Sequence, residues 1–298
     1  MMNYVILDME WDSAYHPFYK RFVNQILQIG AVKLDDNFNV VDIFDVIVKS
    51  SISKKVSGRF SQLTGITGEI MRSGVDLCEA VQKYNEWLGD DTIMITWSNS
   101  DLYTIVENQR YLLKNLRFKT DKYLDLQKYI QGEMSLLGYE CKSQISLGNA
   151  AGILGITTDS YKLHNAKDDS LLCTEMLKKY YCKDRFEKYI KDTANPDFFK
   201  RLCFKPYFIS DISDTSIEKS ALDFYCNICG KKMKRLSKWQ FKNNSFSANF
   251  ICRSCNKKFI CRVSFKKTFD SVIVKRRILE PKVKKAGDNS DTLQYMPS

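Results

Sequence analysis

The sequence predicts an α/β fold in which a mixed five-stranded sheet is covered by helices on both faces and followed by a small metal-stabilised module. Segments typical of strands and of amphipathic helices alternate over most of the chain, as expected for a sheet packed between helices. Two Cys-x-x-Cys motifs lie further along, in a segment that also carries the excess of positive charge. These observations separate an α/β module from a second, basic module.

The composition is that of an ordered globular protein. The chain has 298 residues, of which 44% are hydrophobic and 13% aromatic, enough for one sizeable core and a smaller one. The start of the chain lacks the basic region and apolar run of a signal peptide, and no stretch is long enough to span a membrane. We therefore expect a cytoplasmic protein with no membrane partner. Its ten cysteines should then be thiols or metal ligands rather than disulfides.

The net charge of +11 is unevenly distributed. Residues 222–298 contain 18 Lys and Arg against 5 Asp and Glu, a balance of +13, whereas residues 1–221 contain 28 against 30, a balance of −2. The C-terminal quarter therefore holds all of the positive excess, which indicates a polyanionic partner.

The first predicted strand delivers two acids. Tyr4–Leu7 is a run of four apolar residues, typical of a strand buried on both faces, and Asp8 and Glu10 follow it. Two residues apart on a strand, both acids point to the same face, roughly 7 Å apart. Buried like charges require a positive partner, and carboxylate oxygens suit Mg²⁺ or Mn²⁺. The alternative is that the strand ends at Leu7 and both acids are solvated loop residues.

The next segment indicates an antiparallel meander. Residues 25–34 and 40–49 read as strands joined by a turn at Asp35–Asn37. A loop at Leu63–Thr67 follows, in which Thr67 is a plausible N-cap for a short helix.

Helices and strands then alternate. Apolar spacing predicts a helix over residues 75–88 and a buried strand over 92–97. Ser98 or Ser100 can cap the next helix, which should run to about Asn115, and a fifth strand is expected over residues 123–126.

Two further segments bring polar groups to the same edge. Asp101 comes just after the fourth strand, where ligands gather in such sheets, although an acid in a first helical turn is also ordinary capping chemistry. Further on, Asp169 falls on the apolar stripe of a predicted helix, whereas Asp168 falls on a more exposed side. His164 lies on the loop before that helix. The alternative is that Asp169 pairs with a lysine and His164 lies on the surface.

The other histidine, His16, reads as a loop residue rather than a ligand.

The chain resembles the DEDDh 3′→5′ exonucleases of the DnaQ-like group in three motifs that occur in the same order. They are DMEW at residues 8–11, WSNSDL at 97–102 and HNAKDD at 164–169. Within this group, two further segments are most similar to the KapD-like and histone-mRNA-exonuclease-like branch, namely LQIGAVKLD at 27–35 and LTGIT at 63–67. The resemblance covers roughly residues 3–190. It departs from the family at Met9, where threonine is common, at Ser98 and Ser100, and at residues 12–20, which lengthen the loop after the first strand.

The resemblance implies a ribonuclease-H-like fold and a two-metal hydrolysis of phosphodiester bonds. Two Mg²⁺ or Mn²⁺ ions would be held by the four acids, which are Asp8, Glu10, Asp101 and Asp169. His164 would be the general base, because histidine is the side chain suited to exchange protons near neutral pH. The terminal 3′ nucleotide would be bound by backbone at Met9 and Glu10 and by the loop residues Leu63, Gly65, Ile66 and Thr67.

The second module carries a predicted zinc site. Cys226 and Cys229 form one Cys-x-x-Cys knuckle and Cys252 and Cys255 form the other, a spacing typical of a zinc ribbon in which four thiolates hold the ion tetrahedrally. Buried thiols are the alternative, and Cys261 reads as a core thiol rather than a fifth ligand.

We therefore predict four segments: an exonuclease domain at 1–193, a linker or packed extended segment at 194–221, a basic four-cysteine zinc ribbon at 222–279 and a disordered tail at 280–298. The predicted function is 3′→5′ exonuclease activity on single-stranded nucleic acid, which the sequence does not resolve into RNA or DNA. The alternative is a regulatory nucleic-acid-binding protein that uses the same fold without turnover. The ribbon could grip nucleic acid or dock a protein partner.

Overall fold

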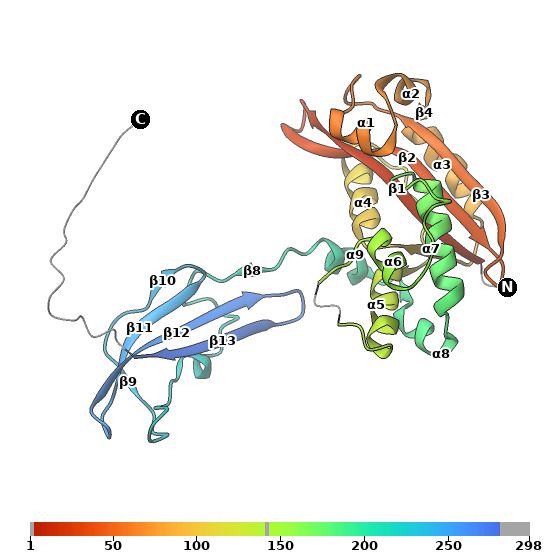
Figure 1. The fold of residues 1–298 in the computed structure, drawn as a ribbon. Helices are drawn as coiled ribbons and strands as arrows, with labels where there is room; N and C mark the ends of the chain where they lie inside the picture. Colours follow the sequence, from red (N-terminus) through yellow and green to blue (C-terminus); the bar gives the residue numbers. More distant parts are fainter. Residues whose placement is uncertain (1–2, 141–142, 281–298) are drawn as a thin grey trace, which may run out of the picture. The chain divides into compact units, whose positions relative to one another are not determined.

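The computed structural model describes residues 3–140 and 143–280. The chain divides between Leu202 and Cys203 into two compact units, and Figure 1 shows the elements of each. The predicted tail from residue 281 onward lies outside the described residues. Within the described ranges, every helix is too short or too polar to cross a membrane.

The first unit is built on a mixed sheet with strand order β4-β3-β2-β1-β5-β6-β7. The five predicted strands form its contiguous centre and are confirmed, and two-residue strands extend both edges. β1 pairs antiparallel with β2 and parallel with β5. The strands are β1 (Asn3–His16), β2 (Arg21–Leu34), β3 (Val40–Lys49), β4 (Val75–Asp76), β5 (Thr92–Thr96), β6 (Lys122–Asp125) and β7 (Lys191–Asp192).

The first two strands are longer than the sequence indicated. β1 continues through both acids to His16, and its ladder with β2 closes at the pair His16 and Arg21. The expectation that residues 12–20 form a lengthened loop is therefore wrong, and His16 is a strand residue. The register shifts between Glu10 and Trp11, a local irregularity of the kind that bends a strand and increases its twist.

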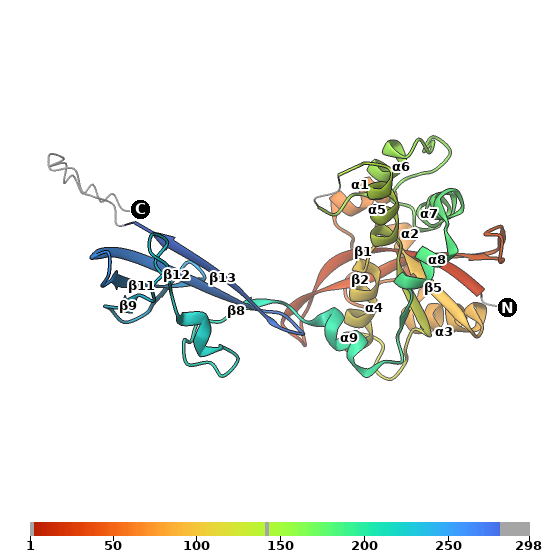
Figure 2. The ribbon, with the colours of Figure 1, turned by 90° about the horizontal axis from the view of Figure 1, so that it is seen from below.

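Helices cover both faces of the sheet. One face packs Ile6 against α5 (Leu126–Leu136), α6 (Leu147–Ile153) and α7 (Ala166–Tyr180). The other packs Val5, Leu7 and Met9 against α3 (Leu77–Leu88) and α4 (Ser100–Tyr111). Figure 2 shows α6 and α7 on one side of the strands and α3 on the other.

Two helix caps were predicted, with opposite outcomes. The Thr67 hydroxyl accepts a hydrogen bond from the Ile70 backbone N–H and caps α2 (Gly68–Ser73), as expected. The N-cap of α4 is instead Asn99, not Ser98 or Ser100, and α4 ends at Tyr111 rather than near Asn115. The remaining helical elements of this unit are α1 (Gly58–Thr64), α8 (Lys183–Phe186) and η1 (Glu187–Tyr189).

The segment 194–221 is not one linker. Its first part forms α9 (Pro196–Cys203), whose Phe198 and Leu202 pack against the core beneath α3 and α4. Its later part contains β8 (Tyr207–Phe208), and its Ile209 and Ile217 are buried in the core of the second unit. Both parts are packed structure, divided at the unit boundary.

The second unit is an antiparallel sheet with strand order β10-β11-β12-β13, in which β8 pairs with β12 and β9 with β11. Phenylalanines from β11 and β12 and the buried Cys261 form its core, so Cys261 is a core thiol as expected. The elements are η2 (Lys219–Leu222), β9 (Lys234–Arg235), β10 (Gln240–Lys242), β11 (Ser245–Cys252), β12 (Lys257–Lys267) and β13 (Val272–Leu279).

Candidate functional site

The two acids on β1 point away from the α3 and α4 side of the sheet. Met9 packs on that side, so the alternation along a strand turns its neighbours Asp8 and Glu10 toward α7. Asp8 lies opposite Gly30 of β2, and Glu10 lies opposite Gln28. The alternative reading of both acids as solvated loop residues is therefore wrong, because the strand continues through them.

Gly30 lets α7 approach the sheet closely. A Cβ built on Gly30 would lie 2.3 Å from the backbone C of Ala166 and 2.3 Å from the backbone N of Lys167, so no larger residue fits there. The Ser170 hydroxyl donates to the Gly30 carbonyl at 3.1 Å, which ties the helix to the strand at the same point. The first turn of α7 therefore lies directly over the strand position that faces Asp8.

Asp169 and His164 extend the site from α7 and from the loop before it. The His164 backbone N–H donates to Asp169 Oδ2 at 3.1 Å. Ligand atoms of Glu10, His164 and Asp169 all lie within 4.8 Å of one another. His164 adopts a φ of 63°, in the left-handed region, and is exposed. The proposed pairing of Asp169 with a lysine does not occur among the described residues.

Asp101 reaches the site from the start of α4. It is 3% exposed, and its Oδ1 accepts a hydrogen bond from the Met9 backbone N–H at 3.1 Å. Its side chain is thus engaged with β1 between the two strand acids, rather than only capping its own helix.

The pKa values of both strand acids are raised by burial and by neighbouring carboxyl groups. Burial, followed by the charges of Asp101, Asp169 and Glu10, raises the pKa of Asp8 well above its ordinary value. Burial and the charges of Asp169 and Asp101 raise the pKa of Glu10 to about 8. Asp8 and Glu10 are therefore harder to ionise because of the neighbouring acids and because water is excluded.

The other two acids are shifted less. Burial raises the pKa of Asp101 to about 7, against hydrogen bonds from its own and the Met9 backbone N–H. Burial raises the pKa of Asp169 to about 6, against the backbone N–H and charge of His164. Asp169 Oδ1 is buried without a hydrogen-bond partner. Clustered carboxylate oxygens with one orphaned atom are a donor set that a divalent cation fits.

The predicted nucleotide-binding residues differ in how far their side chains are exposed. The side chains of Met9 and Ile66 are buried, at 2% and 4% exposure, so only their backbone could reach a ligand. The Thr67 hydroxyl caps α2, and Gly65, with a φ of 81°, ends α1. Leu63 is 45% exposed and is the member of the set with a large accessible side chain.

Lys162 was not identified from the sequence. Its Nζ donates to the Thr64 carbonyl at 3.1 Å, and its backbone N–H donates to Asp168 Oδ2 at 3.0 Å. Lys162 therefore joins the loop that carries His164 to the C-terminal end of α1, where Leu63 and Thr64 of the expected loop are helical. No sequence pattern marks this lysine, whereas Gly30 inside a strand is a recognisable sign of a close backbone approach.

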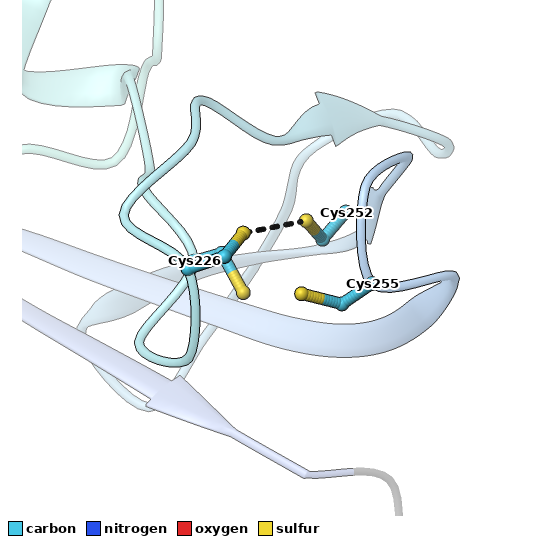
Figure 3. A group of neighbouring side chains, drawn as sticks. Cys226, Cys252 and Cys255 are labelled. Atoms are coloured by element: carbon cyan, nitrogen blue, oxygen red, sulfur yellow. Dashed lines mark hydrogen bonds between the residues drawn. The ribbon is translucent and has the colours of Figure 1, made fainter.

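The second unit brings its four predicted cysteines together. Sulfur atoms of Cys226, Cys229, Cys252 and Cys255 lie within 4.8 Å of one another. Figure 3 shows the labelled thiols directed toward one another from two turns. Gly230, with a φ of 71°, donates its N–H to the Cys226 carbonyl and closes the first turn. Four thiols at this separation can hold one metal ion.

Together, the fold and the first site define a nuclease of the class in which carboxylates gather at one edge of a mixed sheet. The chain belongs to the exonuclease family (RNase_T), whose model matches residues 5–177. It is 24% identical over 179 residues to "DNA polymerase III PolC-type" from Thermotoga petrophila, covering 60% of this chain and 12% of that protein.

Two solved structures share the fold. Cell-death related nuclease 4 has a TM-score of 0.51 and 19% identity, covering 59% of this chain and 62% of that one. The nuclease domain of 3′hExo, a DEDDh family member bound to rAMP, has a TM-score of 0.50 and 22% identity, covering 59% and 90%. The ribonuclease-H-like fold expected from the DEDDh resemblance is therefore confirmed.

Proposed function

We propose that the protein is a 3′→5′ exonuclease that hydrolyses phosphodiester bonds of single-stranded nucleic acid. The observation that carries this proposal is the convergence of Asp8, Glu10, Asp101 and Asp169 at one point, with raised pKa values and with His164 beside them. A module that only binds nucleic acid gains nothing from burying four carboxylates together, because phosphate and carboxylate repel each other.

Each residue of the site has a role that its position supports. Asp8, Glu10 and Asp169 would hold one divalent ion, and Asp8 and Asp101 a second. Such ions stabilise the negative charge that develops on the attacking and leaving oxygens. His164, on an exposed loop within 4.8 Å of Glu10 and Asp169, would take the proton of the attacking water. The backbone hydrogen bond from His164 to Asp169 fixes the loop relative to the metal-binding carboxylates.

The second unit would hold one Zn²⁺ through its four cysteines. Thiolate ligands in a tetrahedral arrangement select zinc. The two turns that carry the cysteines join the parts of a small sheet, so the ion would stabilise the fold of this unit.

Two observations support nucleic acid as the substrate class: the relatives that the chain matches and the charge of its C-terminal part. The matched relatives include a DNA polymerase and a nuclease domain bound to a ribonucleotide, which supports nucleic acid without selecting RNA or DNA. The charge balance of +13 in residues 222–298 supports an extended polyanion rather than a mononucleotide.

End-labelled strands test this proposal. Purified protein is incubated with 5′-labelled single-stranded RNA or DNA in Mg²⁺, Mn²⁺ or chelator, each strand ending in a 3′ hydroxyl or a 3′ phosphate. We expect a ladder that shortens one nucleotide at a time from the free 3′ hydroxyl, only with metal. Internal cuts, or equal degradation of the blocked strand, would contradict the proposed direction.

A further inference from the structure

The sheet of the second unit has one face that the core does not use. On β12, every second side chain is buried in the core, namely Phe259, Cys261, Val263 and Phe265. Because side chains alternate along a strand, the residues between them point to the opposite face. These residues include Arg262, Ser264 and Lys266. The β12–β13 register places Arg277 opposite Arg262 and Lys275 opposite Ser264. We call Arg262, Ser264, Lys266, Lys275 and Arg277 the basic face.

The basic face is hollowed beside the β10–β11 turn. Arg262, Lys275 and Arg277 line a cavity of about 350 Å³ together with Asn243, Asn244 and Ser245. Asn243 and Asn244 form a two-residue hairpin turn with φ values of 50° and 56°. Phe208 of β8 lines the same cavity and is partly buried. Guanidinium, ammonium, amide and hydroxyl groups thus surround one hollow beside an aromatic ring.

Acidic residues are scarce in the sequence around this face. Residues 240–279 contain ten Lys and Arg and one acid, Asp270. Among the described residues, no Asp or Glu forms an ion pair with Arg262, Lys275 or Arg277. Arg262 and Arg277 lie directly opposite each other, where like charges destabilise a sheet. An anion between them would remove this repulsion, and bidentate guanidinium groups suit phosphate.

Charges on a sheet can also serve to keep an edge strand from pairing with another chain, but this explains only some residues of the basic face. Cations on an edge strand prevent pairing with another chain, and β13 is at the edge of the sheet. Arg262 is on β12, between β11 and β13, so it protects no edge. Arg276, by contrast, is on β13 opposite Val263, on the other face, and is exposed. It therefore provides a matched control for Arg277.

We propose that the basic face binds backbone phosphates of the single-stranded nucleic acid, with a phosphate between Arg262 and Arg277. The Asn243, Asn244 and Ser245 side chains hydrogen-bond the same nucleotide, and Phe208 offers a ring on which a base can stack. This surface lies away from the cysteine cluster, because Ser245 and Cys252 are at opposite ends of β11, about 23 Å apart at roughly 3.3 Å per residue. The zinc site then shapes the unit, and the sheet face contacts the strand.

Binding to a catalytically silent full-length chain tests this surface. In an Asp8→Asn background, fluorescence anisotropy measures the affinity for labelled oligo(dT) and oligo(U) across a salt series. Each neutralised phosphate of a single strand contributes about −0.7 to the slope of log K against log salt. We expect Arg262→Ser and Arg277→Ser each to weaken binding and to make the slope about 0.7 less steep. Arg276→Ser should leave the slope at its starting value.

Three results would overturn the proposal. Equal effects of Arg276→Ser and Arg277→Ser would show that only the overall charge matters. Unchanged binding in the Arg262→Ser, Arg277→Ser double variant, with full zinc content, would show that the strand lies elsewhere. Arg277-dependent binding to phosphatidylserine vesicles without binding to either strand would assign the face to a membrane. Failure of the proposed nuclease function would be separate, since it would appear as absent hydrolysis by the wild-type chain.

Discussion

At the scale of single residues, the site is a cluster of carboxyl groups that destabilise one another without a cation. Glu10, Asp101 and Asp169 have pKa values raised to about 8, about 7 and about 6. The folded, metal-free protein therefore binds more protons than the unfolded chain over this range. Stability from these groups is fully present below the ordinary carboxyl pKa and is lost as pH rises through the folded values.

This linkage predicts a pH dependence opposite to that of a salt-bridged acid. In the metal-free full-length chain, circular dichroism should show the urea midpoint of the first unit falling as the pH rises from about 4, the ordinary carboxyl pKa, to about 8, the raised pKa of Glu10. Excess Mg²⁺ should remove most of the fall, because a bound cation offsets the repulsion. Glu10→Gln should flatten the metal-free profile. A midpoint that rises with pH in the absence of metal would contradict the assigned shifts.

His164 permits a second prediction that separates its ring from its backbone. Its φ of 63° is tolerated by asparagine better than by most residues, so His164→Asn removes the imidazole with little backbone strain. We expect a loss of about 10²–10⁴ in rate if the ring is the general base, with unchanged metal affinity. The acidic limb of the pH–rate profile should disappear. A wild-type rate with an unchanged profile would assign His164 a structural role.

At the scale of elements, the contact between α7 and β2 positions the site. Gly30→Ala places a Cβ 2.3 Å from two backbone atoms of α7, so the helix carrying Asp169 must shift away from Asp8. A displacement of about 1 Å can cost about 10² in rate, and overpacking costs about 1–3 kcal/mol of stability. Steady-state kinetics and urea unfolding measure both effects.

Gly152 in α6 is the matched control for this substitution. A Cβ there meets no atom within 4 Å, so Gly152→Ala should leave the rate unchanged and raise stability by about 0.5–1 kcal/mol. If Gly30→Ala were as active as Gly152→Ala, the close approach of α7 would have no part in assembling the site.

The sequence predicts the elements of the site better than their extent. The five central strands and the inward position of Asp169 follow from hydrophobic periodicity, which is set by burial. The continuation of β1 to His16 does not, because residues 11–16 contain polar and aromatic residues whose strand conformation depends on pairing with β2. Lys162 was missed for a related reason, since its hydrogen bond to Thr64 joins a loop to the end of a helix that is distant in sequence.

At the scale of the whole molecule, the boundary between units differs from the one expected. We predicted a linker or packed extended segment at 194–221. The segment is packed, but it is divided: Phe198 and Leu202 pack in the first unit, and Ile209 and Ile217 in the second. Composition could not reveal this, because short segments rich in polar residues and proline can be packed by a few apolar anchors. The charge imbalance located the basic unit correctly but could not say which face carries it.

The boundary leads to a truncation prediction. A chain that ends at Leu202 keeps the core of the first unit intact and should hydrolyse very short strands at nearly the full rate. It should bind longer strands more weakly and with a flatter salt slope. A chain that ends at residue 221 should be less soluble, because Ile209 and Ile217 lose the core that buries them. Equal affinity of the Leu202 truncation and the full chain for long strands at every salt would favour a protein partner for the second unit.

Loss of the metal in the second unit should act in the same way. Cys226→Ser removes one of four thiols within 4.8 Å of one another and should release one zinc per chain, measured by atomic absorption. The second unit should unfold while short strands are still cleaved. Full zinc content in this variant would mean that Cys226 is not a ligand, and a wild-type chain without zinc would mean that the cysteines are only buried thiols.

The most direct test compares two neighbouring positions in one assay. The rate of mononucleotide release from a 5′-labelled single strand in Mg²⁺ is measured for the wild-type chain, Asp169→Asn and Asp168→Asn. Asp169 lies beside Glu10 and His164, whereas Asp168 accepts a hydrogen bond from the Lys162 backbone, which asparagine can also accept. We predict undetectable release by Asp169→Asn, with the fold retained, and release by Asp168→Asn close to that of the wild type. Undiminished release by Asp169→Asn would contradict the assignment of the four carboxylates as the catalytic site.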